Sequence, residues 1–292
     1  MAQLIVNADD FGLTPGVNRA VAELHRASVL TSASLMARAL ATDDAIQIAL
    51  ATPSLGVGCH VVLVDGEPVL RSAAIPHLVG PRTGSLHSSL AGFLARLFFK
   101  PGSRAAMVRE IEAEAAAQIA WLQNRGVRLS HIDTHKHVHM FPAVLRPVLR
   151  AARAAGISAV RNPFEPIWAL RATRAPSWIR MAEVLLLRLL QPVCMRIIAE
   201  EGFVTTGGTL AVVGTGSLDD DAVTSLLSSL QPGVWELVTH PGYNDRELAK
   251  VCTRLRQSRD IERQALQAVL NFPEIERVSF ASLQPQRPLG RL

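Results

Sequence analysis

The sequence predicts an α/β fold, an irregular (β/α) TIM-like barrel with seven or eight parallel strands. Short apolar runs alternate with longer amphipathic or Ala/Leu-rich segments, a pattern typical of parallel strands joined by crossover helices. The length of 292 residues suits one such barrel, and 49% hydrophobic against 19% charged residues allows a large core. We therefore expect a single domain over residues 1–292.

The first half of the chain contains apolar runs of strand length. Strands are predicted at Leu4–Val6, Ala33–Met36, Leu55–Gly58 and Leu129–Asp133. Helices are predicted between them, at Pro15–Ala27, Thr42–Ala51 and Arg104–Asn124. Thr14 is expected to cap the first helix. The third helix places five apolar residues on one face: Met107, Ile111, Ala115, Ile119 and Leu122.

The second half continues the alternation. Helices are predicted at Pro142–Ala155, Leu218–Leu230 and Arg246–Leu270, and strands at Ala159–Arg161, Trp235–Thr239 and Arg277–Phe280. Two insertions, at about residues 65–101 and 163–202, interrupt this rhythm. Because barrels carry specificity loops at such points, we expect both insertions to act as lids or substrate-specificity segments.

Each insertion contains an apolar segment interspersed with arginines, at Leu90–Phe99 and Ile179–Ile198. Such helices lie against a membrane or a lipid tail, but they also cover ordinary cores, because arginine stems extend along apolar surface. The sequence leaves both interpretations open: a cover for the barrel, or peripheral contact with the inner membrane.

Composition excludes several classes of protein. The net charge of +5 and the pI of about 9.7 come from scattered arginines without a basic, aromatic-rich stripe, so we expect no nucleic-acid partner. Cys59, Cys194 and Cys252 form no CxxC pair, which favours reduced thiols. No run of about 18 uncharged apolar residues occurs, and Asp9 and Asp10 interrupt the first apolar run, so we expect a cytoplasmic protein.

Aspartate and histidine side chains lie at the C-terminal ends of four of the predicted strands. Asp9 and Asp10 follow the first strand, His60 the third, the run His131–His139 lies at the end of the fourth, and His240 follows a later one. In a parallel barrel, catalytic groups come from the C-terminal ends of several strands. We therefore expect these side chains to meet at one rim.

Two of these features favour a metal site. Adjacent carboxylates allow one to bind a cation while the other accepts a proton, although a bare Asp-Asp pair is also typical of a helix cap. His60 and His135 form with Asp10 a set of three protein ligands, which leaves a fourth position open as in catalytic metal sites. On an extended chain, His135, His137 and His139 would line one wall.

Four stretches carry a resemblance to a known family: residues 5–12 (IVNADDFG), 58–68 (GCHVVLVDGEP), 131–141 (HIDTHKHVHMF) and 240–243 (HPGY). Together they resemble the YdjC-like carbohydrate deacetylases over nearly the whole chain. Residues 61–79 and 160–168 are most similar to the branch associated with hopanoid biosynthesis, whose members are linked to deacetylation of a glycosylated hopanoid. The other familiar branch acts on acetylated chitooligosaccharides.

This resemblance implies a barrel hydrolase that binds one divalent metal ion and removes the N-acetyl group of an amino sugar. Asp10, His60 and His135 match the metal ligands, Asp9 the general base, and His240 a histidine beside the leaving group. Zinc suits two histidines and one carboxylate, and family members are also described with magnesium. The resemblance also suggests a homodimer.

Further residues are expected around this centre. Arg161 and Tyr243 are predicted to contact the substrate, His137 and His139 either to contact it or to support the metal ligands from behind, and Asp133 to orient a ligand imidazole. Arg161 has two alternative roles, orienting Asp9 or forming a structural ion pair.

Two other functions stay open. A metal-dependent phosphoesterase also clusters aspartates and histidines, but the chain has no glycine-rich phosphate cradle and no evident second set of metal ligands. A non-catalytic glycolipid-binding barrel would keep the fold without turnover. The presence of all four residues of the expected centre disfavours that function: Asp9, Asp10, His60 and His135.

Overall fold

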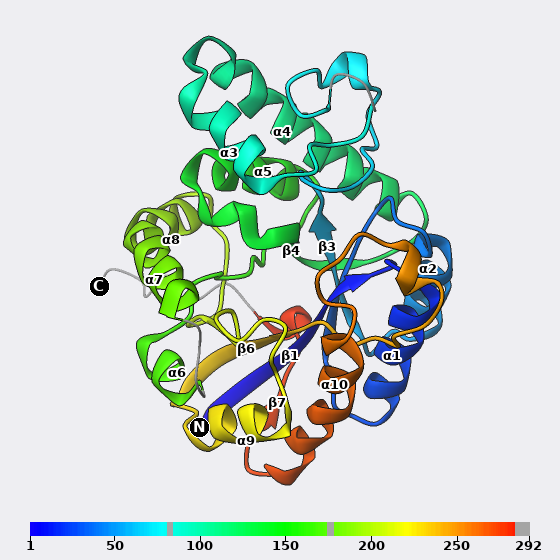
Figure 1. The fold of residues 1–292 in the computed structure, drawn as a ribbon, viewed down its shortest axis with the longest axis vertical. Coiled ribbons are helices and arrows are strands. Elements are labelled where there is room, and N and C mark those ends of the chain that lie inside the picture. Colours follow the sequence, from blue (N-terminus) through cyan, green and yellow to red (C-terminus); the bar gives the residue numbers. More distant parts are fainter. Residues whose placement is uncertain (81–83, 174–177, 284–292) are drawn as a thin grey trace, which may run out of the picture.

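A computed structural model describes residues 1–80, 84–173 and 178–283. Its strands are β1 Ala2–Phe11, β2 Ser32–Leu35, β3 Gly56–Val61, β4 Leu129–Thr134, β5 Thr209–Leu210, β6 Gly233–Thr239 and β7 Glu276–Arg277. They form one curled sheet in the spatial order β4-β3-β2-β1-β6-β5, and β7 pairs with the start of β1 (Figure 1). Every pairing is parallel, as predicted.

Helices surround this sheet. They are α1 Pro15–Arg26, α2 Thr42–Ala51, α3 Leu90–Phe99, α4 Pro101–Gln123, α5 Pro142–Ala154, α6 Ile167–Ala172, α7 Trp178–Leu187, α8 Gln191–Glu200, α9 Asp220–Ser228 and α10 Ser258–Ala265. In Figure 1, α1, α2 and α10 lie to the right of the sheet, and α6, α7 and α8 to its left. The main hydrophobic core lies between the sheet and these helices.

Local features of the sequence account for several of these elements. Thr14 caps α1, because its Oγ1 accepts a hydrogen bond from the Val17 amide at 3.3 Å. The apolar face predicted for α4 is fully buried, with all five of its residues at 0% exposure. Strand β1 is longer than predicted because it crosses the centre of the sheet and Leu4 to Phe11 are buried throughout.

The parallel α/β fold is confirmed, but a full TIM-like barrel of seven or eight strands is not. Residues Ala159–Arg161, expected to form a full strand, make only isolated bridges, Ile132 to Val160 and Ala159 to Val204. This segment is short because Pro163 follows closely and proline has no amide hydrogen for a ladder. The described sheet is therefore open between β4 and β5.

The C-terminal third differs from its prediction in two further respects. The helix expected over Arg246–Leu270 begins only at Ser258, and before it the chain forms a single 3-10 turn at Leu248–Lys250. Thr253 Oγ1 accepts a hydrogen bond from the Leu255 amide, a local contact that competes with helix formation. The short strand β5 was not predicted.

The two insertions carry α3 and α6–α8. Residues 81–83 and 174–177 of the insertions, and residues 284–292 of the expected domain, lie outside the described residues. Among the helices of the described chain, none is long and apolar enough to span a membrane.

Gly58 of β3 leaves room for a neighbouring ring. A Cβ atom at this position would lie 2.4 Å from the His131 imidazole, which is buried and stacked on Phe280 with ring centroids 3.9 Å apart.

We expect Gly58→Ala to lower the free energy of unfolding by about 2 kcal/mol through overpacking, measured by urea denaturation. Gly102→Ala is the control, because a Cβ atom there meets nothing within 4 Å. Equal stability of the two variants would contradict this packing.

Candidate functional site

The C-terminal ends of four strands meet at one cavity of about 1220 Å³. Asp9 and Asp10 at the end of β1, His60 in β3, His135 just after β4 and His240 just after β6 all line this cavity. The structure thus brings together five residues that sequence analysis placed at one rim.

A β-bulge near the end of β1 turns two adjacent carboxylates into the cavity. In a regular strand, neighbouring side chains point to opposite faces. The register of β1 on β2 shifts between Ala8 and Phe11, and Asp10 has a φ of 62°, in the left-handed region. Such strained backbone is retained where a bulge aims a side chain at a site. Asp9 and Asp10 consequently both reach the cavity.

Asp10, His60 and His135 each place a ligand atom within 4.8 Å of the other two. Asp10 Oδ1 lies 3.2 Å from His135 Nδ1 and 3.6 Å from His60 Nε2. This oxygen is buried without a hydrogen-bond partner, which is costly for a carboxylate unless a cation binds it. Two imidazoles and one carboxylate suit zinc in particular. The three residues therefore fit a divalent ion.

Asp133 orients the His60 ring. Its Oδ1 lies 2.9 Å from His60 Nδ1, so that nitrogen donates to the carboxylate and Nε2 is left to face Asp10. Burial lowers the pKa of His60, but the carboxylates of Asp133, Asp9 and Asp10 outweigh this effect and raise the pKa to about 9. The contact has the geometry expected of a residue that orients a ligand imidazole.

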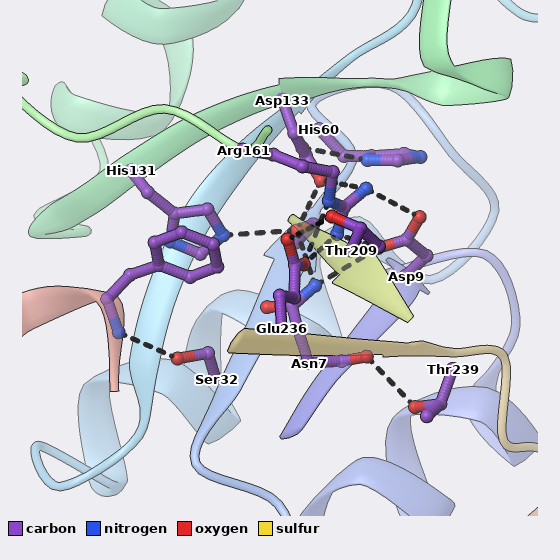
Figure 2. Close-up of polar contacts among 12 residues, drawn as sticks. Asn7, Asp9, Ser32, His60, His131, Asp133, Arg161, Thr209, Glu236 and Thr239 are labelled. Carbon is purple, nitrogen blue, oxygen red and sulfur yellow. Dashed lines mark hydrogen bonds and ion pairs between the residues drawn. The ribbon is translucent and has the colours of Figure 1, made fainter. Parts of the chain in front are cut away.

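Arg161 binds three buried carboxylates at once (Figure 2). Its guanidinium lies 2.5 and 2.9 Å from the oxygens of Asp9, 2.6 Å from Asp133 and 2.7 Å from Glu236. Burial opposes ionisation of Asp9, yet Arg161 and His60 together outweigh burial and lower the pKa of that carboxyl. Burial raises the pKa of Glu236 to about 7 despite the same arginine.

This geometry corrects one of the roles predicted for Arg161. Its side chain is 0% exposed and does not line the cavity, so it has no surface to offer a sugar. The predicted substrate contact is wrong. Arg161 lies instead where it orients Asp9 and neutralises the buried carboxylates around it.

His240 lines the cavity beside Asp9. Its Nε2 is 3.9 Å from Asp9 Oδ2, and its backbone amide donates to Glu262 Oε2 at 3.0 Å. Burial lowers the pKa of His240 to about 4, and burial also raises the pKa of Glu262 to about 8. At pH 7 the imidazole of His240 is therefore neutral.

Sequence analysis missed Arg259 and Glu262, which α10 brings to the site. Arg259 Nη2 donates to Asp10 Oδ2, the oxygen turned away from the two histidines. Burial opposes ionisation of Asp10, but Arg259 and His135 together outweigh burial and hold the pKa of that carboxyl well below its usual range. The sequence signals these two residues only as an arginine and a glutamate three positions apart, and both are buried on one face of α10.

The His-x-His-x-His run is not extended, contrary to prediction. Residues His135–Met140 form a 3-10 turn in which His137 has a φ of 52°. His135 and His137 line the cavity, whereas His139 is 1% exposed and its Nδ1 lies 2.7 Å from Thr134 Oγ1. The burial of His139 favours the second of its two predicted roles, support from behind the ligands, and both roles of His137 stay predictions.

Tyr243 also lies outside the cavity lining. Its hydroxyl donates to the Glu23 carboxylate, and the guanidinium carbons of Arg19 and Arg263 lie 3.7 and 4.3 Å from its ring centroid. These contacts occupy the hydroxyl and the ring. Contrary to its predicted contact with substrate, Tyr243 anchors the segment after β6 to α1.

The buried network makes a prediction about stability. Arg161→Met leaves three buried carboxylates without their cation, and we expect it to lower the free energy of unfolding by about 3–5 kcal/mol at pH 8. The unpaired carboxyls will have raised pKa values when folded, so the folded state binds more protons and the deficit shrinks toward pH 5.

Urea denaturation at both pH values measures this deficit. Arg153→Met is the matched control, because Arg153 also pairs with a glutamate but is 57% exposed, so its loss is expected to cost at most about 1 kcal/mol. A deficit for Arg161→Met that is as small as the control, or that does not change with pH, would contradict the network.

Comparison with known proteins places the chain in a family. The sequence profile of the YdjC-like protein family matches residues 3–277. A carbohydrate deacetylase of Brevibacillus brevis is 40% identical over 154 residues, which cover 51% of this chain and 55% of that protein. A carbohydrate deacetylase of Thermoanaerobacter pseudethanolicus is 27% identical over 267 residues, 91% of each chain.

A solved structure shares the fold. A protein of Enterococcus faecalis named for cellobiose-phosphate cleavage superposes with a TM-score of 0.72 at 23% identity, covering 96% of this chain and 98% of that one. The match of the family profile over nearly the whole chain, together with these relatives, shows that the chain belongs to the YdjC-like protein family.

Proposed function

We propose that this protein is a metal-dependent hydrolase that removes the N-acetyl group from an acetylated amino sugar. One observation carries the proposal: the unpartnered Oδ1 of Asp10 faces two imidazoles, directly beside a second ionised carboxylate, in a cavity large enough for a sugar. The two relatives named as carbohydrate deacetylases support the sugar substrate and the reaction.

Asp10, His60 and His135 would hold the metal ion, and three protein ligands leave a position open for other oxygen ligands. A bound divalent ion supplies Lewis-acid chemistry: it makes water more acidic and the acetyl carbonyl more electrophilic. Both zinc and magnesium supply this Lewis-acid chemistry, and the two imidazole ligands favour zinc.

The residues beside the metal ligands handle protons. Asp9 is ionised at neutral pH and is held by Arg161 and by Asn7, whose Nδ2 donates to Asp9 Oδ1 at 3.0 Å. A fixed, ionised carboxylate is suited to accept the proton of the attacking water. His240 lies near the same carboxylate, and its neutral imidazole would take up the proton that Asp9 has accepted and pass it to the departing sugar amine. Acetate and the free amino sugar result.

The cavity walls bear on the acceptor to which the sugar is attached. Leu90 and Leu94 of α3, and Ile179, Leu186 and Leu187 of α7, form an apolar part of the lining. A chitooligosaccharide would leave much of this surface without a partner, whereas a hopanoid-linked sugar would cover it. The lining therefore supports the lipid-linked substrate, with His137 at the sugar end.

A phosphoesterase with two metal ions is less well supported. Asp9, His60 and Asp133 also lie close enough to form a ligand group, but Arg161 donates to both of its carboxylates. A guanidinium in that place competes with a second cation. A non-catalytic barrel would not require Asp9 to be kept ionised beside the metal ligands.

Two conservative variants test the assignment. We expect Asp10→Asn to lose the bound metal, because the site then lacks its only anionic ligand, and Asp9→Asn to keep the metal while acetate release falls by about 10²–10⁴-fold. Metal content is measured by mass spectrometry. Acetate is measured with acetylated chitooligosaccharides and acetylglucosaminyl hopanoids as substrates, and thermal melting checks that both variants fold.

Full metal occupancy in Asp10→Asn would refute the ligand set. Release of phosphate from a generic phosphate ester, without acetate from any acetylated sugar, would identify the protein as a phosphoesterase.

A further inference from the structure

An apolar stripe runs along the outer surface of the second insertion. It consists of Trp178 and Leu185 of α7, Leu189 of the 3-10 turn Arg188–Leu190, and Val193 of α8. Their exposed fractions are 79%, 46%, 73% and 44%. Because spacings of seven and four residues return to the same helical face, these side chains form one surface. In Figure 1, α7 and α8 form the left edge of the molecule.

Covering the sheet does not explain this stripe. The opposite side of the same helices already packs inward through Val184 and Cys194, which are buried. The insertion is therefore apolar on both sides, whereas a helix that only covers a core carries polar residues outside. A contiguous exposed apolar surface on a folded chain marks a place of interaction.

The charge around the stripe indicates what kind of surface it contacts. The described residues of α6, α7, the 3-10 turn and α8 contain four arginines and two glutamates: Arg171, Arg180, Arg188, Arg196, Glu183 and Glu200. Arg150 and Arg153 of α5 are half-exposed and pair with Glu201 at the end of α8, so they balance that carboxylate. A tryptophan and leucines flanked by arginines are typical of helices that lie in the interface of an anionic bilayer.

The stripe also borders the cavity. Ile179, Leu186 and Leu187 line the cavity from α7, while Leu185 and Leu189 on the adjacent side of the same segment do not. A surface on which the stripe rests would therefore lie beside the cavity.

We propose that the stripe of Trp178, Leu185, Leu189 and Val193 docks on the surface of a membrane that contains anionic lipids. Docking places the cavity beside the bilayer without any membrane-spanning segment. The proposal extends the proposed function, but docking does not require the deacetylation reaction, because the stripe shares no residue with the candidate metal centre.

Vesicle flotation of the full chain tests this proposal. We expect the protein to float with phosphatidylcholine vesicles that contain phosphatidylglycerol, less with phosphatidylcholine alone, and less at high salt. The double variant Leu185→Glu/Leu189→Glu should reduce partitioning by at least roughly tenfold, since burying even one leucine is worth about that factor. Its acetate release from a water-soluble substrate should stay unchanged, because neither residue lines the cavity.

The matched control is Leu50→Glu/Leu270→Glu, which adds the same charge at positions that are 47% and 40% exposed and lie outside the stripe. It should float like the wild type, and thermal melting verifies that both variants fold. Three outcomes would overturn the proposal: no flotation of the wild type, equal losses in both double variants, or a dimer in light scattering that only the stripe variant dissociates. In the last case a second copy of the chain covers the stripe.

Discussion

The burial of carboxylates at the ends of the central strands is the constraint on which the site depends. Asp9, Asp10, Asp133 and Glu236 are each at most 3% exposed and lie close to one another. Buried charges of one sign are tolerated only when cations compensate them. Arg161 compensates three of the four, and Arg259 binds one oxygen of Asp10. The other oxygen of Asp10 remains for a further cation, which is where the two histidines converge.

Because Asp9 and Asp10 pair with different arginines, the two neighbouring aspartates are suited to different roles. Both oxygens of Asp9 face Arg161, which fixes its orientation and keeps it ionised, so it is a suitable proton acceptor. Asp10 turns through the bulge so that its Oδ1 faces His60 and His135. Asp133 then selects the nitrogen that His60 presents. One distortion of the central strand would therefore separate the proposed proton acceptor from the proposed metal ligands.

Much of this arrangement could be predicted, because polar residues that follow buried strands reach the same edge of a parallel sheet. The meeting of Asp10, His60 and His135 at one point follows from that rule, and the ligand preferences of metals then suggested a role for the three residues. The contributions of Arg259 and Glu262 could not be found this way, since their helix has an ordinary amphipathic pattern and the chain before it is irregular. The turn at His137 and the open edge of the sheet depend on backbone conformation and tertiary pairing, which side-chain periodicity does not encode.

Anomalous diffraction from crystals soaked in zinc tests the central claim most directly, because it locates the ion without reference to activity. The arrangement of ligands predicts one peak at about 2.0–2.2 Å from Asp10 Oδ1, His60 Nε2 and His135 Nδ1, with Arg161 still bound to Asp9 and Asp133. A peak between Asp9 and Asp133 in the place of the guanidinium, or no peak among the three residues, would contradict it.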